Sequence, residues 1–122
     1  MVSDIWLSSL IDIFRPDAML REVSATLFIT AHAKITDTLL IEGSVDMLTL
    51  PVQEILHRSH KASARQILLI HTHPSGDPRP SPQDIAVTRR LCQHLRRQHL
   101  RMMDHIILTQ DQYFSFRAHR LL

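Results

Sequence analysis

The chain has 122 residues, which is long enough to bury one hydrophobic core and too short for a second. Its residues are 44% hydrophobic and 21% charged, a composition unlike that of a disordered segment. Its formal net charge of +2 is a weak sign of a polyanionic partner. No apolar run reaches membrane-span length and the N-terminus lacks a signal-peptide pattern, so we expect a cytoplasmic protein with no membrane partner. The lone Cys92 excludes an internal disulfide and the paired cysteines of a zinc finger or a nucleobase deaminase.

The chain is predicted to begin with a helix. Ser3 or Asp4 suits its N-cap, and Pro16 is expected to end it. Trp6 is expected to cover the edge of the domain. We favour packing of this helix on the core, with a dimer contact as the alternative. Its apolar side is expected to consist of Ile5, Leu7, Leu10, Ile11 and Phe14.

Residues 22–30 and 35–41 are predicted to pair as a β-hairpin, because the first run alternates like a strand and only a short connection separates the two. Gly43 is expected to break or bulge the second strand. Pro51 then suits the first turn of a helix that runs to about Ala64.

In the second half, an apolar strand at residues 66–70 precedes a long helix from Pro82 to about Gln98. A strand at 102–109 and its hairpin partner at 113–116 follow. This order predicts a single α/β domain with a mixed β-sheet flanked by helices. The long helix carries several exposed arginines, which is typical of a solvated face. Attraction of an acidic substrate or nucleic acid toward the site is the less favoured alternative, because no aromatic side chains interleave to stack bases.

The segment between the apolar strand and the long helix carries the chemistry. His71 and His73 lie two apart, so on an extended backbone both side chains leave the same face. Ser81-Pro82-Gln83-Asp84 fits a helix start, with Ser81 at the N-cap and Asp84 at the third helical position. Two imidazole nitrogens and one carboxylate oxygen match the three protein ligands of a catalytic zinc site, whose fourth position stays open to water.

Each part of this pattern has an ordinary explanation when taken alone. Ser-x-x-Asp is a common capping device, and most His-x-His pairs are surface or core histidines. The joint arrangement, with a proline- and glycine-rich loop between the histidines and the helix-start aspartate, favours a bound metal. Zinc suits the ligand set best, although other divalent ions fit it as well.

The segment resembles the JAMM (MPN+) metalloprotease motif, His-x-His-Pro followed by Ser-x-x-Asp. The longer string from His73 to Leu91, together with Asp104-His105, is similar to the RadC family. Thr72 is a departure, because RadC-like sequences usually carry Asn there.

This likeness runs from about residue 21 to residue 122. We therefore expect one domain over residues 1–122, with an N-terminal helical segment at 1–20 and a family-like core at 21–122. The resemblance implies a JAMM/MPN-like fold of cytidine-deaminase-like architecture. Longer RadC proteins carry a helical hairpin region before this domain, for which this chain is too short.

A metal-activated water cuts an amide faster when a nearby carboxylate takes its proton. From the residues alone, a solvated strand-end residue is the preferred interpretation of Glu22. The resemblance favours Glu22, because Arg21-Glu22-Val23 ahead of an apolar strand looks like the stretch where JAMM proteins carry their catalytic glutamate. Glu42 is the second choice. The further carboxylates considered are Glu54, Asp37 and Asp46.

Other residues are expected to complete the site. The Ser81 hydroxyl is expected to cap the helix and to donate to a developing oxyanion. The loop at 74–80 is expected to wall a cleft, with Gly76 permitting a turn, and Thr72 is placed beside the cleft or behind the ligands. Asp104 is expected to orient an imidazole, with a salt bridge to an arginine as an equally simple alternative.

These expectations together predict a zinc-dependent hydrolase that cleaves a peptide or isopeptide bond, with a protein or peptide as substrate. Two alternatives stay open. One is a DNA-associated protein that binds or cuts DNA, as the repair label of RadC-like proteins suggests. The other is a non-catalytic metal-binding scaffold for partner proteins.

Overall fold

The computed structural model describes residues 4–18 and 20–122, except for the side chains of residues 4–7 and 17. The predicted roles of Ile5, Trp6 and Leu7 therefore lie outside the described side chains. In chain order, the elements are α1 (Asp4–Ala18), β1 (Val23–Thr30), β2 (Ile35–Glu42), α2 (Val52–Lys61), β3 (Ala64–Thr72), α3 (Pro82–Arg97), β4 (Arg101–Leu108) and β5 (Tyr113–Ser115). None of the helices in the described part of the chain is long and apolar enough to cross a membrane.

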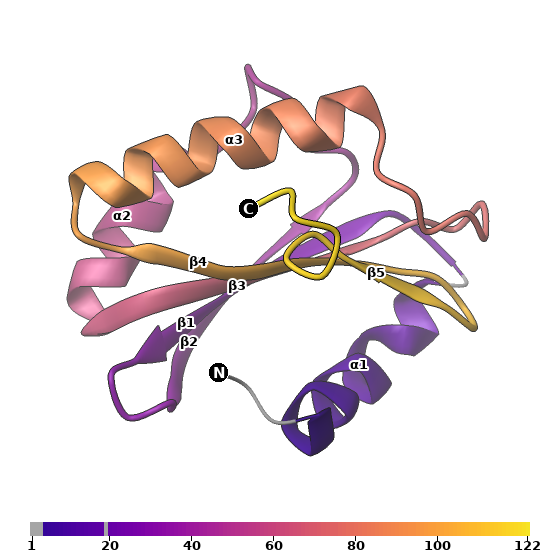
Figure 1. Cartoon of the computed structure of the whole chain (residues 1–122), viewed down its shortest axis with the longest axis horizontal. Coiled ribbons are helices and arrows are strands. Elements are labelled where there is room, and N and C mark those ends of the chain that lie inside the picture. Colours follow the sequence, from indigo (N-terminus) through magenta and orange to yellow (C-terminus); the bar gives the residue numbers. More distant parts are fainter. Residues whose placement is uncertain (1–3, 19) are drawn as a thin grey trace.

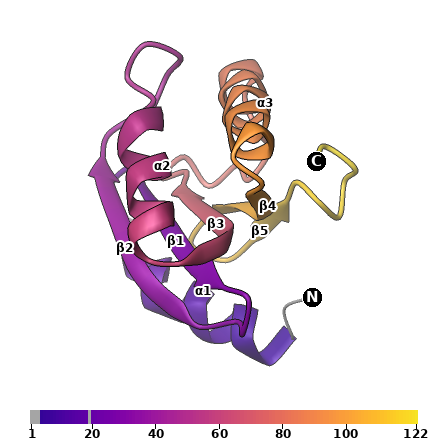
Figure 2. The same cartoon turned by 90° about the vertical axis from the view of Figure 1, so that its left-hand side faces the viewer.

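The strands form one sheet in the order β2-β1-β3-β4-β5. β1 is antiparallel to both β2 and β3, β3 and β4 are parallel, and β5 is antiparallel to β4. α2 and α3 cover one face of this sheet and α1 lies against the other (Figures 1 and 2). The prediction of a mixed sheet flanked by helices is confirmed.

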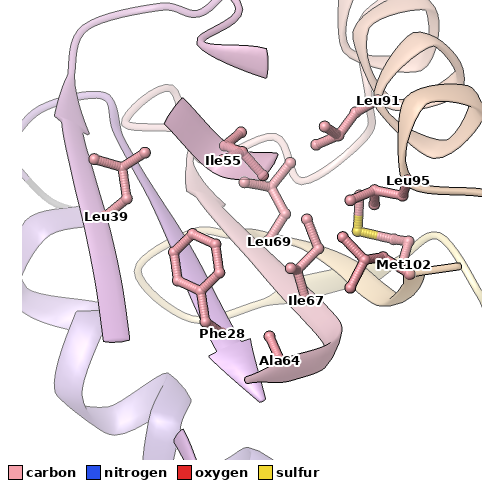
Figure 3. Packing of buried hydrophobic residues seen from close by; sticks show 10 residues of the cluster. Phe28, Leu39, Ile55, Ala64, Ile67, Leu69, Leu91, Leu95 and Met102 are labelled. Atoms are coloured by element: carbon pink, nitrogen blue, oxygen red, sulfur yellow. The ribbon is translucent and has the colours of Figure 1, made fainter. Parts of the chain in front are cut away.

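The central strand β3 is buried on both faces, which explains its unbroken apolar run. Ile67 and Leu69 point toward the larger core cluster, under α2 and α3, where Leu91 and Leu95 of α3 pack (Figure 3). Leu68 and its neighbour Ile70 point the other way, toward α1. His71 continues the first of these two faces, so the core orients the first histidine toward α3.

Two helix ends differ from the prediction. α1 continues past Pro16 to Ala18, although proline supplies no N–H to the helix. Ala18 is only 1% exposed and packs with Ile11 and Leu108. This burial offsets the free energy lost with the missing hydrogen bond. α2 ends at Lys61 and not near residue 64. Ser63 adopts a left-handed backbone conformation (φ 54°), which turns the chain directly into β3.

Candidate metal centre

The candidate site lies where three elements meet. β1 and β3 run antiparallel with Ser24 opposite His71, so the start of β1 lies beside the end of β3. Glu22 directly precedes β1, and α3 begins at Pro82 after the loop at 73–81. Asp84, in the first turn of α3, faces the two histidines.

His71 lies between two carboxylates. Its Nε2 is 2.7 Å from Oε1 of Glu22, and its Nδ1 is 3.7 Å from Oδ1 of Asp84. The residue is only 7% exposed. Both carboxylates therefore face a buried imidazole whose two nitrogens point at oxygen atoms.

His73 has one nitrogen committed to the loop and one facing Asp84. Its Nδ1 lies 3.0 Å from the carbonyl oxygen of Asp77, and a carbonyl only accepts, so Nδ1 carries the proton of that bond. Nε2 lies 3.2 Å from Oδ2 of Asp84. A metal-binding histidine is commonly oriented in this way, with its second nitrogen donating to a carbonyl.

The start of α3 is a capping box, as predicted. The Ser81 hydroxyl accepts a hydrogen bond from the N–H of Asp84 (3.0 Å), and Oδ2 of Asp84 accepts one from the N–H of Ser81 (2.8 Å). Burial alone would raise the pKa of Asp84, but the bonds from His73 and from the Ser81 N–H outweigh it and hold that pKa well below its usual range. Asp84 is therefore an anion at neutral pH, held by the backbone against two imidazoles.

The donor set fits a divalent metal ion. Glu22, His71 and His73 each offer one ligand atom, and these atoms lie within 4.8 Å of one another. Asp84 adds a second carboxylate against both rings. Ligand atoms around a tetrahedral zinc ion lie about 3.3 Å apart, a spacing within the 4.8 Å over which the atoms of Glu22, His71 and His73 are spread.

Ligand and base are not distinguished by distance alone. Glu22 touches His71 more closely than Asp84 does, whereas Asp84 alone contacts both imidazoles. The structure thus brings the four residues together without separating the metal ligand from the base.

Thr72 supports Glu22 through the backbone. Its hydroxyl accepts from the N–H of Val23 (2.7 Å) and donates to the carbonyl of Arg21 (2.8 Å), the residues on either side of Glu22. One side chain thereby joins the end of β3 to the start of β1.

Ser44 was not anticipated from the sequence. Its hydroxyl donates to Oε2 of Glu22 at 2.7 Å, while Oε1 faces His71. Burial would raise the pKa of Glu22, but the bonds from Ser44 and His71 lower it below its usual value. Glu42, the second candidate for the base, instead forms an exposed ion pair with Arg21.

Asp104 does not have the arrangement expected of it. Its carboxylate accepts from the Ser115 hydroxyl (2.5 Å) and from the backbone N–H groups of His105 and Arg117. It thus fastens the C-terminal turn to β4 instead of orienting an imidazole. The reason is strand alternation, because the next residue, His105, is the one that points toward α3.

An open cleft of about 340 Å³ lies over the cluster. Ser81 lines it together with Ser44 and the loop residues Pro74 and Ser75. Gly76 adopts a left-handed conformation (φ 89°) in an exposed turn of the same loop. The predicted cleft wall therefore comes from the loop, with Glu22, His73 and Asp84 on the cleft surface.

Known proteins resemble this chain over most of its length. The model of a family described as the RadC-like JAB domain matches residues 7–121. A UPF0758 protein of Pelobacter propionicus is 41% identical over 75 residues, which is 62% of this chain and 33% of the relative. UPF0758 proteins of Alkaliphilus oremlandii and Pseudomonas fluorescens are 36% and 39% identical over 96 and 95 residues, or 79% and 77% of this chain.

The chain covers 41% and 42% of the latter two relatives, so it spans well under half the length of the curated proteins it matches. The family match, in contrast, extends over nearly all of the chain and includes the whole histidine and aspartate motif. The resemblance to RadC noted in the motif is thereby confirmed. This chain belongs to the RadC family, as a RadC-like JAB domain.

Proposed function

We propose that this domain is a zinc-dependent hydrolase that cleaves a peptide or isopeptide bond. The observation that carries the proposal is the clustering of two imidazoles and two carboxylates beside an open cleft. Glu22, His71 and His73 offer ligand atoms within 4.8 Å of one another, and Asp84 contacts both imidazoles. Two of these groups make bonds that fix their orientation: Asp84 in the capping box and His73 to the loop carbonyl.

In this proposal His71, His73 and Asp84 hold the ion. Asp84 suits a ligand because it contacts both imidazoles and is held as an anion by the helix start. A divalent ion bound there supplies Lewis acidity, which lowers the pKa of a bound water to roughly 7 and polarises a carbonyl.

Glu22 is then the proton carrier. Its carboxylate lies 2.7 Å from Nε2 of His71, and its lowered pKa keeps it deprotonated at neutral pH. It accepts the proton of the attacking water and passes it to the leaving amine. The backbone bonds of Thr72 and the hydroxyl of Ser44 keep this carboxylate in place.

Ser81 completes the proposed machinery. Its oxygen accepts from the N–H of Asp84, so its own proton is free for a group in the cleft. A substrate carbonyl that lies over the cluster receives this hydroxyl as its negative charge develops. Capping and oxyanion stabilisation therefore use different parts of one hydroxyl group.

The first test is metal content together with hydrolysis. We expect protein purified without a His tag to contain one zinc ion per chain, and to cleave members of a library of peptides and lysine-linked isopeptides until a chelator is added. His71→Ala is expected to abolish both metal binding and cleavage. His57→Ala removes an exposed histidine of α2 and is the matched control, expected to change neither. Metal-free wild-type protein, or cleavage that persists in the chelator, would contradict the proposal.

The two alternatives give different results in the same preparation. A DNA-associated protein binds duplex or single-stranded DNA with an affinity that falls steeply with salt concentration. A scaffold binds zinc and captures proteins without cleaving them. The Glu22→Gln variant, used as a substrate trap, separates enzyme from scaffold: it is expected to retain molecules that the wild-type protein releases as products.

A further inference from the structure

A second, smaller pocket lies behind the metal centre, between the sheet and the helices α2 and α3. Its volume is about 30 Å³, and most of its wall is apolar. It adjoins the cleft, because Val45 and Asp84 line both. The pocket therefore lies next to the place where the proposed substrate lies. Other wall residues include Ile41, Ile55, Val87 and His71.

His105 of β4 is the polar group of this wall that the proposed mechanism does not use. The residue is 3% exposed, and its ring stacks on Phe116 with a centroid distance of 4.3 Å. Its Nδ1 lies 2.7 Å from the Thr88 hydroxyl of α3. Its Nε2 is buried and has no hydrogen-bond partner in the described part of the chain.

The hydrogen bonds determine which nitrogen carries the proton. Thr88 donates its only hydroxyl proton to the carbonyl of Asp84 at 2.7 Å, because that carbonyl is unable to donate. The Thr88 oxygen therefore accepts from Nδ1–H of His105. In a neutral ring this leaves Nε2 as an unprotonated acceptor.

The surroundings keep the ring neutral. His105 is 3% exposed, stacks on Phe116 and faces a largely apolar wall, and burial of this kind disfavours the charged form of an imidazole. An unpaired buried acceptor costs free energy, so a ligand that donates to it is favoured over one that does not.

We propose that this pocket is a specificity subsite that receives a short substrate side chain with a hydrogen-bond donor, such as threonine or serine, bonded to Nε2 of His105. The size supports a short side chain, since the pocket has room for about two water-sized groups. Threonine has two such branches, a hydroxyl for Nε2 and a methyl for the apolar wall.

This inference deepens the proposed function and rests on it, because the pocket adjoins the cleft of the proposed hydrolase. Its test is nevertheless a binding measurement that needs no cleavage. If no hydrolysis is found but the subsite binds the threonine probe, the result contradicts the proposed function and leaves this inference standing. If hydrolysis is found but the subsite does not bind the threonine probe, the result contradicts this inference and leaves the proposed function standing.

The experiment uses the full chain as purified, with the imidazole nitrogens labelled with ¹⁵N. Two probes are titrated: N-acetyl-threonine N-methylamide and N-acetyl-valine N-methylamide. They differ by a hydroxyl in place of a methyl, so they have nearly the same shape. We expect saturable binding, an upfield shift of the His105 Nε2 resonance with the threonine probe only, and about fivefold tighter binding of that probe.

Two variants complete the design. His105→Phe keeps the ring stacked on Phe116 and removes the acceptor, so the preference for threonine over valine is expected to disappear. His119→Phe is the matched control: this exposed histidine stacks on Phe114 in the C-terminal turn, and its replacement is expected to leave the fivefold preference intact. The wild-type comparison of the two probes stands even if His105→Phe fails to fold.

Three results would overturn the inference. One is equal affinity for the two probes, and another is the absence of saturable binding by either. The third is a His105 Nε2 resonance that is already at a hydrogen-bonded position in the free protein and does not move, because a trapped water then satisfies the acceptor.

Discussion

The hydroxyl of Thr72 holds Glu22 by its backbone, through bonds to the carbonyl before it and the N–H after it. The Glu22 carboxylate is thereby held against His71, one residue from Thr72 on β3. The same strand thus supplies the first histidine of the site and the support for its proposed base. This relationship also explains how threonine can replace the asparagine usual in RadC-like sequences, because an asparagine amide likewise offers one donor and one acceptor.

Thr72→Val is expected to lower the free energy of unfolding by about 2 kcal/mol, because it leaves the buried N–H of Val23 without a partner. Thr72→Asn and Thr72→Ser keep a donor and an acceptor and are expected to lose less. Urea denaturation of the three variants measures the difference. If the valine variant is as stable as the serine variant, the two hydroxyl bonds do not support the strand pair.

Replacements of Ser81 separate its two proposed roles. Ser81→Ala is expected to cost about 1 kcal/mol of stability, whereas Ser81→Gly costs only a few tenths, because glycine is tolerated at an N-cap. Both variants lack the hydroxyl, so both are expected to lower kcat by about 100-fold. Full activity in the glycine variant would show that Ser81 only caps the helix.

Ser44→Ala is expected to shift the pH dependence of hydrolysis. The hydrogen bond from Ser44 contributes to the lowered pKa of Glu22, so its removal raises that pKa toward the ordinary value of 4.5. A general base acts as the deprotonated carboxylate, and the acid limb of the kcat/KM profile therefore moves to higher pH. A profile identical to that of the wild-type protein would argue against Glu22 as the base.

The metal-free protein is expected to lose stability above neutral pH. The hydrogen bond to Asp84 raises the pKa of His73 above its ordinary 6.5, against the opposing effect of burial. This contribution is fully present below pH 6.5 and is lost as the pH rises through the raised pKa. The lowered pKa of Asp84 contributes above pH 3.8 and is lost only as the pH falls through it.

In the proposed site zinc takes the place of the proton on His73, so the increase in Tm on adding zinc is expected to grow with pH. Thermal unfolding in chelator and in zinc, from about pH 5 to about pH 8, measures both effects. A zinc-induced increase that does not change with pH would place the metal away from this histidine.

Local signals in the sequence are sufficient to predict part of this site. Ser81, Pro82 and Asp84 determine a helix start within four residues, and the structure has that capping box. The alternation of β3 likewise aims His71 toward α3. These features depend on nearest neighbours along the chain, which is why a pattern can predict them.

The remaining contacts join residues far apart in sequence. Ser44 reaches Glu22 from a loop after β2, and His105 meets Thr88 across two elements. For the pair Asp104-His105, the sequence pattern predicts a role at the site for the carboxylate. Only the strand register shows that the histidine, and not Asp104, faces the site.

The central claim is the division of labour between the two carboxylates, and a comparison of Glu22→Gln with Asp84→Asn tests it most directly. Both changes remove a charge and nearly preserve shape, and the amide oxygen introduced by Asp84→Asn is still able to accept from the N–H of Ser81. Zinc content and peptide hydrolysis are measured on each purified variant. The account predicts that Glu22→Gln keeps one zinc ion per chain and loses hydrolysis, whereas Asp84→Asn loses the metal. Loss of zinc from Glu22→Gln with retention in Asp84→Asn would contradict it.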